Sequence, residues 1–240
     1  MSNKKKNKPF KIELGMELKR CATCQNAAKA SGINALKNYV CIEGNHIPMS
    51  NDLLAYLKKT RGIYSRIQLS LIPAGDTFKI GDYEFVVLEQ YGDTAAVILK
   101  DLLPNTTAFG ESNNRYDGSY ADQACCTFAE DLAEIIGEDS LLVRSVDLTA
   151  DDGLKDYGRI NRKVSLLTAA EYRSYVEILD KYKPDKWWWL ATPHSTAAHE
   201  NDRWVKCVAP SGFVVNISCN FDDRGGRPFC ILKSNIFVSK

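Results

Sequence analysis

The sequence has no long hydrophobic run, no excess of charge and few histidines. None of its apolar stretches reaches the roughly 18 residues of a membrane-spanning helix, and Lys4–Lys6 leads into no apolar signal-peptide core. We therefore expect no membrane span, no secretion by that route, and a cytoplasmic location at synthesis. The 31 basic and 30 acidic residues leave a net charge of +1, so overall charge indicates no nucleic-acid partner.

Motifs of the common catalytic and cofactor sites are also missing. The chain contains no G-x-S-x-G, P-loop or G-x-G-x-x-G pattern. Its only histidines are His46, His194 and His199, and the last two are five residues apart, a spacing that suits neither one helix face nor one strand face. We therefore expect a protein that is not an enzyme.

Eight cysteines are present, too few for a disulfide scaffold in 240 residues. Without an export signal their default state is a reduced thiol or a metal thiolate. Cys21, Cys24, Cys41 and His46 have the spacing C-x2-C-x16-C-x4-H, which suits a tetrahedral zinc site. A structural zinc would supply folding energy to a segment with little core of its own. The alternative is a C-x-x-C that occurs by chance on a helix, with Cys41 in a core; a redox role is disfavoured because no βαβ unit surrounds it.

Charge is unevenly distributed along the chain. Residues 1–40 contain nine basic and two acidic residues, a net charge of +7, whereas residues 111–160 contain twelve acidic and four basic ones. The first part reads as mostly helical, with a helix beginning near Ser50, and the pattern becomes β-rich from Ile67. We therefore expect a basic N-terminal segment, residues 1–70, and a second domain, residues 71–240.

The second domain begins with signals for a hairpin and two helices. Residues 83–88 and 95–99 flank Gly92–Asp93 and predict a β-hairpin. One helix is predicted to bury Phe128, Leu132, Ile135 and Ile136 and to end at Gly137. A second is predicted to begin after the Thr168–Glu171 capping box, to bury Tyr172, Tyr175, Val176 and Leu179, and to stop before Pro184.

The last 55 residues read as short strands, at 187–190, 204–208, 213–217 and 228–232. The fold class is therefore α+β: an N-terminal hairpin, two helices and a C-terminal antiparallel meander. The predicted core consists of Phe85, Val87, Ile98, Phe128, Leu132, Tyr172, Leu179, Trp188 and Phe229.

Four of these segments carry a family resemblance. Gly81–Leu88, Lys163–Thr168, Trp187–Pro193 and Gly226–Phe229 resemble, in order and spacing, the bacterial and phage domain of unknown function DUF6273. That family is similar in plan to the C-type-lectin fold, shared with formylglycine-generating enzymes and the variable proteins of diversity-generating retroelements. The resemblance covers residues 75–238. It implies a C-type-lectin-like fold, and it departs from the family where Ala191–Thr192 replaces Arg-Ser and Gly226 replaces Val.

The resemblance also points to a ligand surface, because the C-terminal region of the retroelement proteins is their variable, ligand-contacting part. The residues agree, since Pro193–Arg203 is a polar loop and polar side chains alternate from Asn216 onward. The predicted ligand contacts are His194, Ser195, His199, Asn201, Arg203, Asn216, Ser218, Asn220, Asp222 and Arg224. The alternative is ordinary solvated loops; a calcium site is disfavoured because the spacing matches no calcium loop.

Two further residue groups leave alternatives open. Trp187–Trp189 is either a sugar-stacking platform or, as the resemblance favours, part of the core. Cys219 and Cys230 invite comparison with the two active-site cysteines of formylglycine-generating enzymes, but their surroundings lack that motif, so we expect buried thiols there and at Cys125–Cys126.

These observations favour a non-enzymatic protein that binds a protein or carbohydrate ligand or receptor through diversified C-terminal loops, with an oligomer left open. Such a protein belongs to a bacterium or its phage, and would be virion-associated if phage-encoded. The first alternative is a cytoplasmic adaptor that binds nucleic acid or protein through a basic, zinc-binding N-terminal segment. The second is a cysteine-dependent oxidase.

Overall fold

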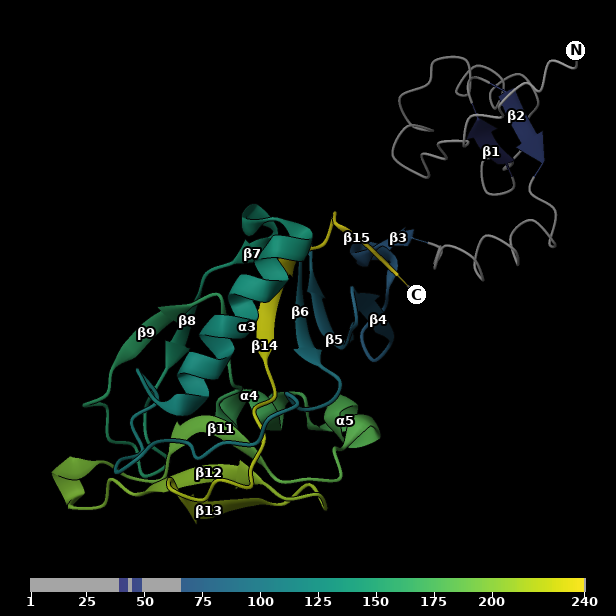
Figure 1. Cartoon of the computed structure of the whole chain (residues 1–240). Coiled ribbons are helices and arrows are strands. Elements are labelled where there is room, and N and C mark those ends of the chain that lie inside the picture. The colour runs from purple at the N-terminus through teal and green to yellow at the C-terminus, as the bar shows by residue number, and fades with distance from the viewer. Residues whose placement is uncertain (1–38, 43–44, 49–65, 240) are drawn as a thin grey trace, which may run out of the picture. The chain divides into compact units, whose positions relative to one another are not determined.

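The structure is a computed structural model that describes residues 39–42, 45–48 and 66–239 (Figure 1). The chain divides into two compact units, Met1–Arg66 and Ile67–Lys240, so the division lies four residues before the expected one. Residues 67–70 belong to the second unit because the Leu69 and Ser70 amides donate to Ile236 and Ser234 at its far end.

The described part of the first unit is a pair of short strands, β1 (Tyr39–Ile42) and β2 (Asn45–Pro48). They are antiparallel, with Cys41 opposite His46. The prediction of a mostly helical segment is wrong for these residues, whose aromatic and β-branched side chains favour strands. The helix predicted near Ser50 lies outside the described residues.

The second unit is α+β, as predicted, and is built on an eight-stranded sheet in the order β10-β14-β6-β5-β4-β15-β3, with β7 also paired to β14. The strands are β3 (Arg66–Gln68), β4 (Thr77–Ile80), β5 (Tyr83–Tyr91), β6 (Thr94–Leu99), β7 (Leu141–Leu142), β10 (Val164–Ser165), β14 (Phe229–Lys233) and β15 (Phe237–Ser239). The predicted hairpin is confirmed as β5 and β6, which pair from Tyr91 and Thr94 outward. Its turn contains Gly92 at φ 58°, a conformation that favours glycine.

A long helix, α3 (Tyr120–Ile136), packs on this sheet (Figure 1). The Ser119 side chain accepts a hydrogen bond from the Asp122 amide at the N-terminus, and Gly137 ends the helix at φ 85°, as predicted. Phe128 and Leu132 are buried. Ile135 is half exposed, however, so the predicted apolar face is one residue too wide.

The second predicted helix is broken into α4 (Ala169–Ser174) and α5 (Val176–Leu179), followed by the 3-10 turn η4 (Asp180–Tyr182). The predicted capping box is confirmed at α4. Tyr172 and Leu179 are buried, but Tyr175 lies at the break and Val176 is exposed, because the break rotates the following turn away from the predicted face. Three other 3-10 turns are η2 (Leu69–Leu71), η3 (Glu138–Ser140) and η5 (Ala197–His199).

A separate three-stranded antiparallel sheet is formed by β11 (Trp188–Pro193), β12 (Trp204–Val208) and β13 (Val214–Ser218). A further pair is β8 (Arg144–Asp147) with β9 (Arg159–Arg162). The predicted C-terminal meander is correct only for these first three strands. β14 leaves them and enters the main sheet between β10 and β6, with Phe229 opposite Ile98.

The core forms two clusters of buried residues, one on each face of the sheets. All the predicted core residues are buried: Phe85, Val87, Ile98, Phe128, Leu132, Tyr172, Leu179, Trp188 and Phe229. Among the described residues, no helix combines the length and apolarity that crossing a membrane requires.

Candidate functional site

The loop between β11 and β12 contains half of the predicted ligand contacts. Part of this loop is held in place by hydrogen bonds to Asp152. Ser195 is buried, and its Oγ donates to Asp152 Oδ2 at 2.6 Å. His199 is exposed, with Nδ1 3.1 Å from the same carboxylate oxygen. The hydrogen bond from Ser195 lowers the pKa of Asp152. Ser195 therefore fixes the loop to the preceding segment and is not free to contact a ligand.

Serine, histidine and aspartate together have the residue types of a catalytic triad, but their order here is wrong for catalysis. Both Ser195 and His199 bind Asp152, whereas a triad needs the histidine between the other two so that it can take the serine proton. The hydroxyl is also buried. This cluster does not form a nucleophile–base pair.

Asn114 organises the loop from inside the protein. It is completely buried, and its Nδ2 donates to the carbonyls of Ser195 and Trp204, both at 2.9 Å. Its Oδ1 accepts a hydrogen bond from the Tyr157 hydroxyl at 2.9 Å, and its main-chain N–H donates to the Asp202 carbonyl. One side chain thus joins both ends of the loop to the body of the domain. Sequence reasoning missed it, because an asparagine outside a recognisable turn motif carries no local signal.

Arg224 was predicted to contact ligand, and the structure places it between a loop and the sheet. Its side chain is buried, with the guanidinium 5.0 Å from the ring centroid of Trp187 and 5.5 Å from that of Phe221. Nη1 also forms an ion pair with Asp223 at 2.5 Å. Cation–π contacts on two rings make Arg224 a connection between loop and sheet.

Lys206 is a buried charge on the face of β12 and β13 that also carries Trp204 and Asn216. Its Nζ lies 2.6 Å from Asp151, which also pairs with Arg173 of α4. Burial raises the pKa of Asp151, but the hydrogen bonds and charges of the two cations outweigh this and lower it overall. The Lys206–Asp151 ion pair lies at one side of the exposed part of the β12–β13 sheet.

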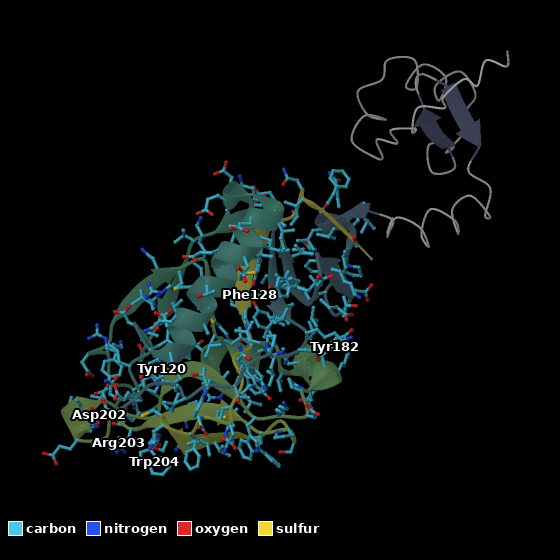
Figure 2. All side chains as sticks on the ribbon, viewed as in Figure 1. Tyr120, Phe128, Tyr182, Asp202, Arg203 and Trp204 are labelled. Carbon is cyan, nitrogen blue, oxygen red and sulfur yellow. The ribbon has the colours of Figure 1, made fainter. Side chains whose placement is uncertain are left out.

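The end of the sheet next to this pair carries five exposed residues and the partly exposed Ser218. This group is here called the outer β12–β13 surface: Arg203, Trp204, Ser218, Asn220, Phe221 and Asp222. Trp204 lies opposite Ser218, whose Oγ donates to Asn220 Oδ1 at 2.8 Å. Figure 2 shows Arg203 and Trp204 at this end of the domain. Trp204 is 44% exposed and Phe221 49%. Indole, amide, hydroxyl and charged groups are therefore presented together.

The remaining predicted contacts are partly covered. His194, Asn201 and Asn216 are only partly exposed. His194 Nδ1 and Asn216 Oδ1 are buried and have no hydrogen-bond partner within the described segments.

The three consecutive tryptophans do not form an exposed platform. Trp188 and Trp189 are buried, and Trp189 Nε1 donates to the Thr107 carbonyl at 3.0 Å. Trp187 is partly buried against Arg224. Of the four tryptophans, the exposed one is Trp204, which the sequence placed in an ordinary strand.

The chain matches no family model, and no match is found among curated proteins or solved structures. Function is therefore inferred from the geometry of the site.

The cysteines of the second unit are free thiols. Cys125, Cys207, Cys219 and Cys230 are buried, and Cys126 is partly buried. Burial raises the pKa of Cys125 and of Cys207 to about 12 and also raises those of Cys219 and Cys230. A nucleophilic cysteine needs a lowered pKa and access, so these thiols have the properties of core residues.

Of the predicted zinc ligands, Cys21 and Cys24 lie outside the described residues. Cys41 and His46 are directly opposite each other in the β1–β2 register. Within residues 66–239, no group of three or more histidine, cysteine or acidic residues is arranged to hold a metal ion.

A hollow of about 260 Å3 lies at the start of α3, lined by residues of the segment 110–120. Beside it, Arg162 binds Asp122 at 2.7 Å and Asp117 at 2.8 Å. The guanidinium is thus neutralised by two carboxylates, which raises the pKa of Arg162 further. Of the charged residues that line the hollow, Glu111 alone has no ion-pair partner within the described part of the chain.

Proposed function

We propose that residues 67–240 form a non-enzymatic binding domain of C-type-lectin-like plan that holds its ligand on the outer β12–β13 surface. The observation that carries this proposal is an exposed Trp204 on a sheet whose adjoining loop is held from inside by Asn114. A rigid support with exposed polar and aromatic groups lowers the entropic cost of binding. The separate three-stranded sheet beside a larger sheet supports the proposed plan.

Carbohydrate is the ligand class that this surface fits best. The apolar face of a sugar ring can stack on the Trp204 indole, as apolar surfaces commonly do on aromatic rings. Ser218, Asn220 and Asp222 place hydroxyl, amide and carboxylate groups within the same surface, where they can exchange hydrogen bonds with sugar hydroxyls. A protein receptor is the other class expected from the sequence.

A printed array of oligosaccharides, probed with the full chain, tests this assignment. We expect retention on some oligosaccharides and at least about a tenfold loss of affinity in Trp204→Ala and in Asn220→Ala, equivalent to about 1.4 kcal/mol. Tyr120→Ala is the matched control, because Tyr120 is 43% exposed and lies at the start of α3 (Figure 2). Equal retention of the Trp204 and Tyr120 variants would place binding elsewhere, and no retention on any oligosaccharide would exclude carbohydrate.

A second candidate function is favoured by the first unit. The β1–β2 register brings Cys41 and His46 to opposite positions, which is compatible with a shared zinc ion, and residues 1–40 have a net charge of +7. We propose that Cys21, Cys24, Cys41 and His46 hold a structural zinc and that the basic segment contacts nucleic acid.

Zinc content of the purified chain and its retention on single-stranded DNA measure this function. We expect about one zinc per chain, lost in Cys41→Ser, and DNA binding that weakens steeply with salt. Cys126→Ser, in the second unit, is the control and should keep the metal. A metal-free wild-type chain would exclude the zinc site.

A further inference from the structure

The outer edge of β13 is an unpaired strand edge. β13 is the last strand of its sheet, and no strand of the described part of the chain pairs with its outer side (Figure 1). At its two ends, the Ala209 amide donates to the Phe213 carbonyl and the Cys219 amide to the Arg203 carbonyl. In an antiparallel pair the hydrogen-bonded positions alternate, so Val214, Asn216 and Ser218 direct their main-chain groups away from β12.

This edge lacks the features that usually prevent pairing with another chain. Proteins protect an open edge with lysines, proline, a bulge or a covering loop. Here the strand is Val-Val-Asn-Ile-Ser, without charge or proline, and its register with β12 is regular throughout. By contrast, the other edge of the sheet is covered, because Gly225 exchanges main-chain hydrogen bonds with Trp187 and Trp189.

We propose that the β13 edge is a homodimer interface in which a second copy of the chain adds its own β13 in antiparallel orientation. The outward-directed residues are centred on Asn216, so a two-fold axis there pairs Asn216 with Asn216 and Val214 with Ser218. The Asn216 pair exchanges two main-chain hydrogen bonds. At each end the Ser218 amide donates to the Val214 carbonyl of the other copy, while the Ser218 carbonyl already accepts from the Phe221 amide at 3.3 Å.

Both ends of β13 carry charges of both signs. Before the strand, Lys183 Nζ lies 3.4 Å from the Ser211 carbonyl and pairs with Asp180. After the strand, Asp222 is exposed and Asp223 pairs with Arg224. Neither end therefore has an excess of one charge that would repel a second copy.

Exposed aromatic residues have the same end-to-end arrangement. Phe213, 74% exposed, precedes β13, and Phe221, 49% exposed, follows it. In the two-fold pair the Phe213 end of one copy lies beside the Phe221 end of the other, and burial of these rings adds apolar contact area. The dimer contains a continuous six-stranded sheet with one outer β12–β13 surface from each copy. Because Phe221 also belongs to the outer β12–β13 surface, dimerisation and ligand binding are measured separately.

Sedimentation equilibrium of the full chain under reducing conditions, without added ligand, tests the proposal through two variants and a control. Asn216→Pro removes only an N–H that points away from β12, so the fold is kept while the interchain bond is lost. Asn216→Asp places two carboxylates opposite each other across the axis, where they repel. Within each copy Lys206 lies opposite position 216 on β12, so the new carboxylate faces a positive charge in the monomer. Asn216→Ala keeps the main-chain groups and serves as the matched control.

We expect wild type and Asn216→Ala to sediment at twice the 26.9 kDa chain mass at micromolar concentration, and both other variants at the chain mass with an unchanged melting temperature. High salt should restore dimerisation of Asn216→Asp but not of Asn216→Pro. A monomeric wild-type chain, or a folded Asn216→Pro variant that still dimerises, would overturn the proposal. Oligosaccharide retention by these monomers would leave the proposed ligand surface intact.

Discussion

The guanidinium of Arg227 lies over the ring of Trp188, 5.2 Å from its centroid, in the interior of the domain. Nε donates to the Leu99 carbonyl at 2.9 Å, and Nη2 donates to those of Lys100 and Tyr182 at 2.8 and 2.9 Å. Burial lowers the pKa of Arg227 to about 10. Trp188 and Arg227, 39 positions apart in sequence, are therefore in contact, and Arg227 joins β6, β11 and η4.

Replacing Arg227 should destabilise the second unit strongly. Arg227→Met leaves three inward-facing carbonyls without donors, and we expect a loss of about 3–5 kcal/mol in the free energy of unfolding. Arg227→Lys keeps the charge but not the planar fork, so its loss should be intermediate. Urea unfolding followed by tryptophan fluorescence measures this unit selectively, because all four tryptophans of the chain lie in it.

The control for Arg227 is Arg159→Met, because the Arg159 side chain is 63% exposed. Its ion pair with Asp147 is solvated, and we expect a change of less than about 1 kcal/mol. Similar losses for the two variants would show that the buried guanidinium contributes no more than a surface charge.

Removing either partner of the Lys206–Asp151 pair should have unequal effects. Asp151→Ala leaves a buried ammonium without its carboxylate, and we expect a loss of about 1–2 kcal/mol, less than for a fully buried pair because Asp151 is partly exposed. Lys206→Met keeps the apolar stem and leaves Asp151 paired with Arg173, so the loss should be below about 1 kcal/mol. Urea unfolding compares the two, and a larger loss for Lys206→Met would contradict this account.

Asn114→Ala should disturb the loop without altering any exposed residue. It removes the donors to the Ser195 and Trp204 carbonyls and the acceptor for Tyr157, with an expected loss of about 2–3 kcal/mol in unfolding free energy. Backbone amides of the loop should exchange faster with deuterium than in wild type. Unchanged exchange would show that other contacts hold the loop.

Acid should destabilise the second unit through carboxylates whose pKa is lowered by folding. Hydrogen bonds from Thr149 lower the pKa of Asp147, and the one from Ser195 lowers that of Asp152, both from an ordinary value of 3.8. The unfolded chain therefore binds more protons, so stability is complete above the ordinary value and declines as the pH falls through the folded pKa values.

Asp152→Asn should make this pH dependence shallower between about pH 5 and pH 3, because one of the contributing carboxylates is gone. The measurement is the free energy of urea unfolding at several pH values, at low and at high salt. A slope as steep as that of wild type would show that Asp152 does not contribute.

Local signals in the sequence predicted the longer strands and helices of the second unit. The β5–β6 hairpin was recognisable because two β-rich runs flank Gly92–Asp93, and hairpin residues are neighbours in sequence. The start of α4 at Thr168 and the end of α3 at Gly137 were also predictable, since a cap involves only residues within one helical turn. The predicted core was correct because burial follows from periodicity within each element.

The candidate site was only partly predictable. The polar loop and β13 were found from composition, but Ser195 and Arg224 are anchored by partners distant in sequence, at Asp152 and Trp187. Whether a polar side chain contacts solvent or a buried partner depends on what packs beside it, and nothing in the local pattern specifies this. Trp204 was missed as an exposed aromatic for the same reason.

The sequence by itself determined the longer helices and strands of the second unit, their approximate ends and most of the apolar residues of the core, because hydrophobic periodicity, turn chemistry and caps act over a few residues. Only the tertiary structure decided that β14 pairs with β6 and not with the three-stranded sheet, and that the Arg227 guanidinium lies over the Trp188 ring. It also decided that β13 keeps an open edge. These are pairings between segments far apart in the chain, and they are selected by the shared burial of all the elements together.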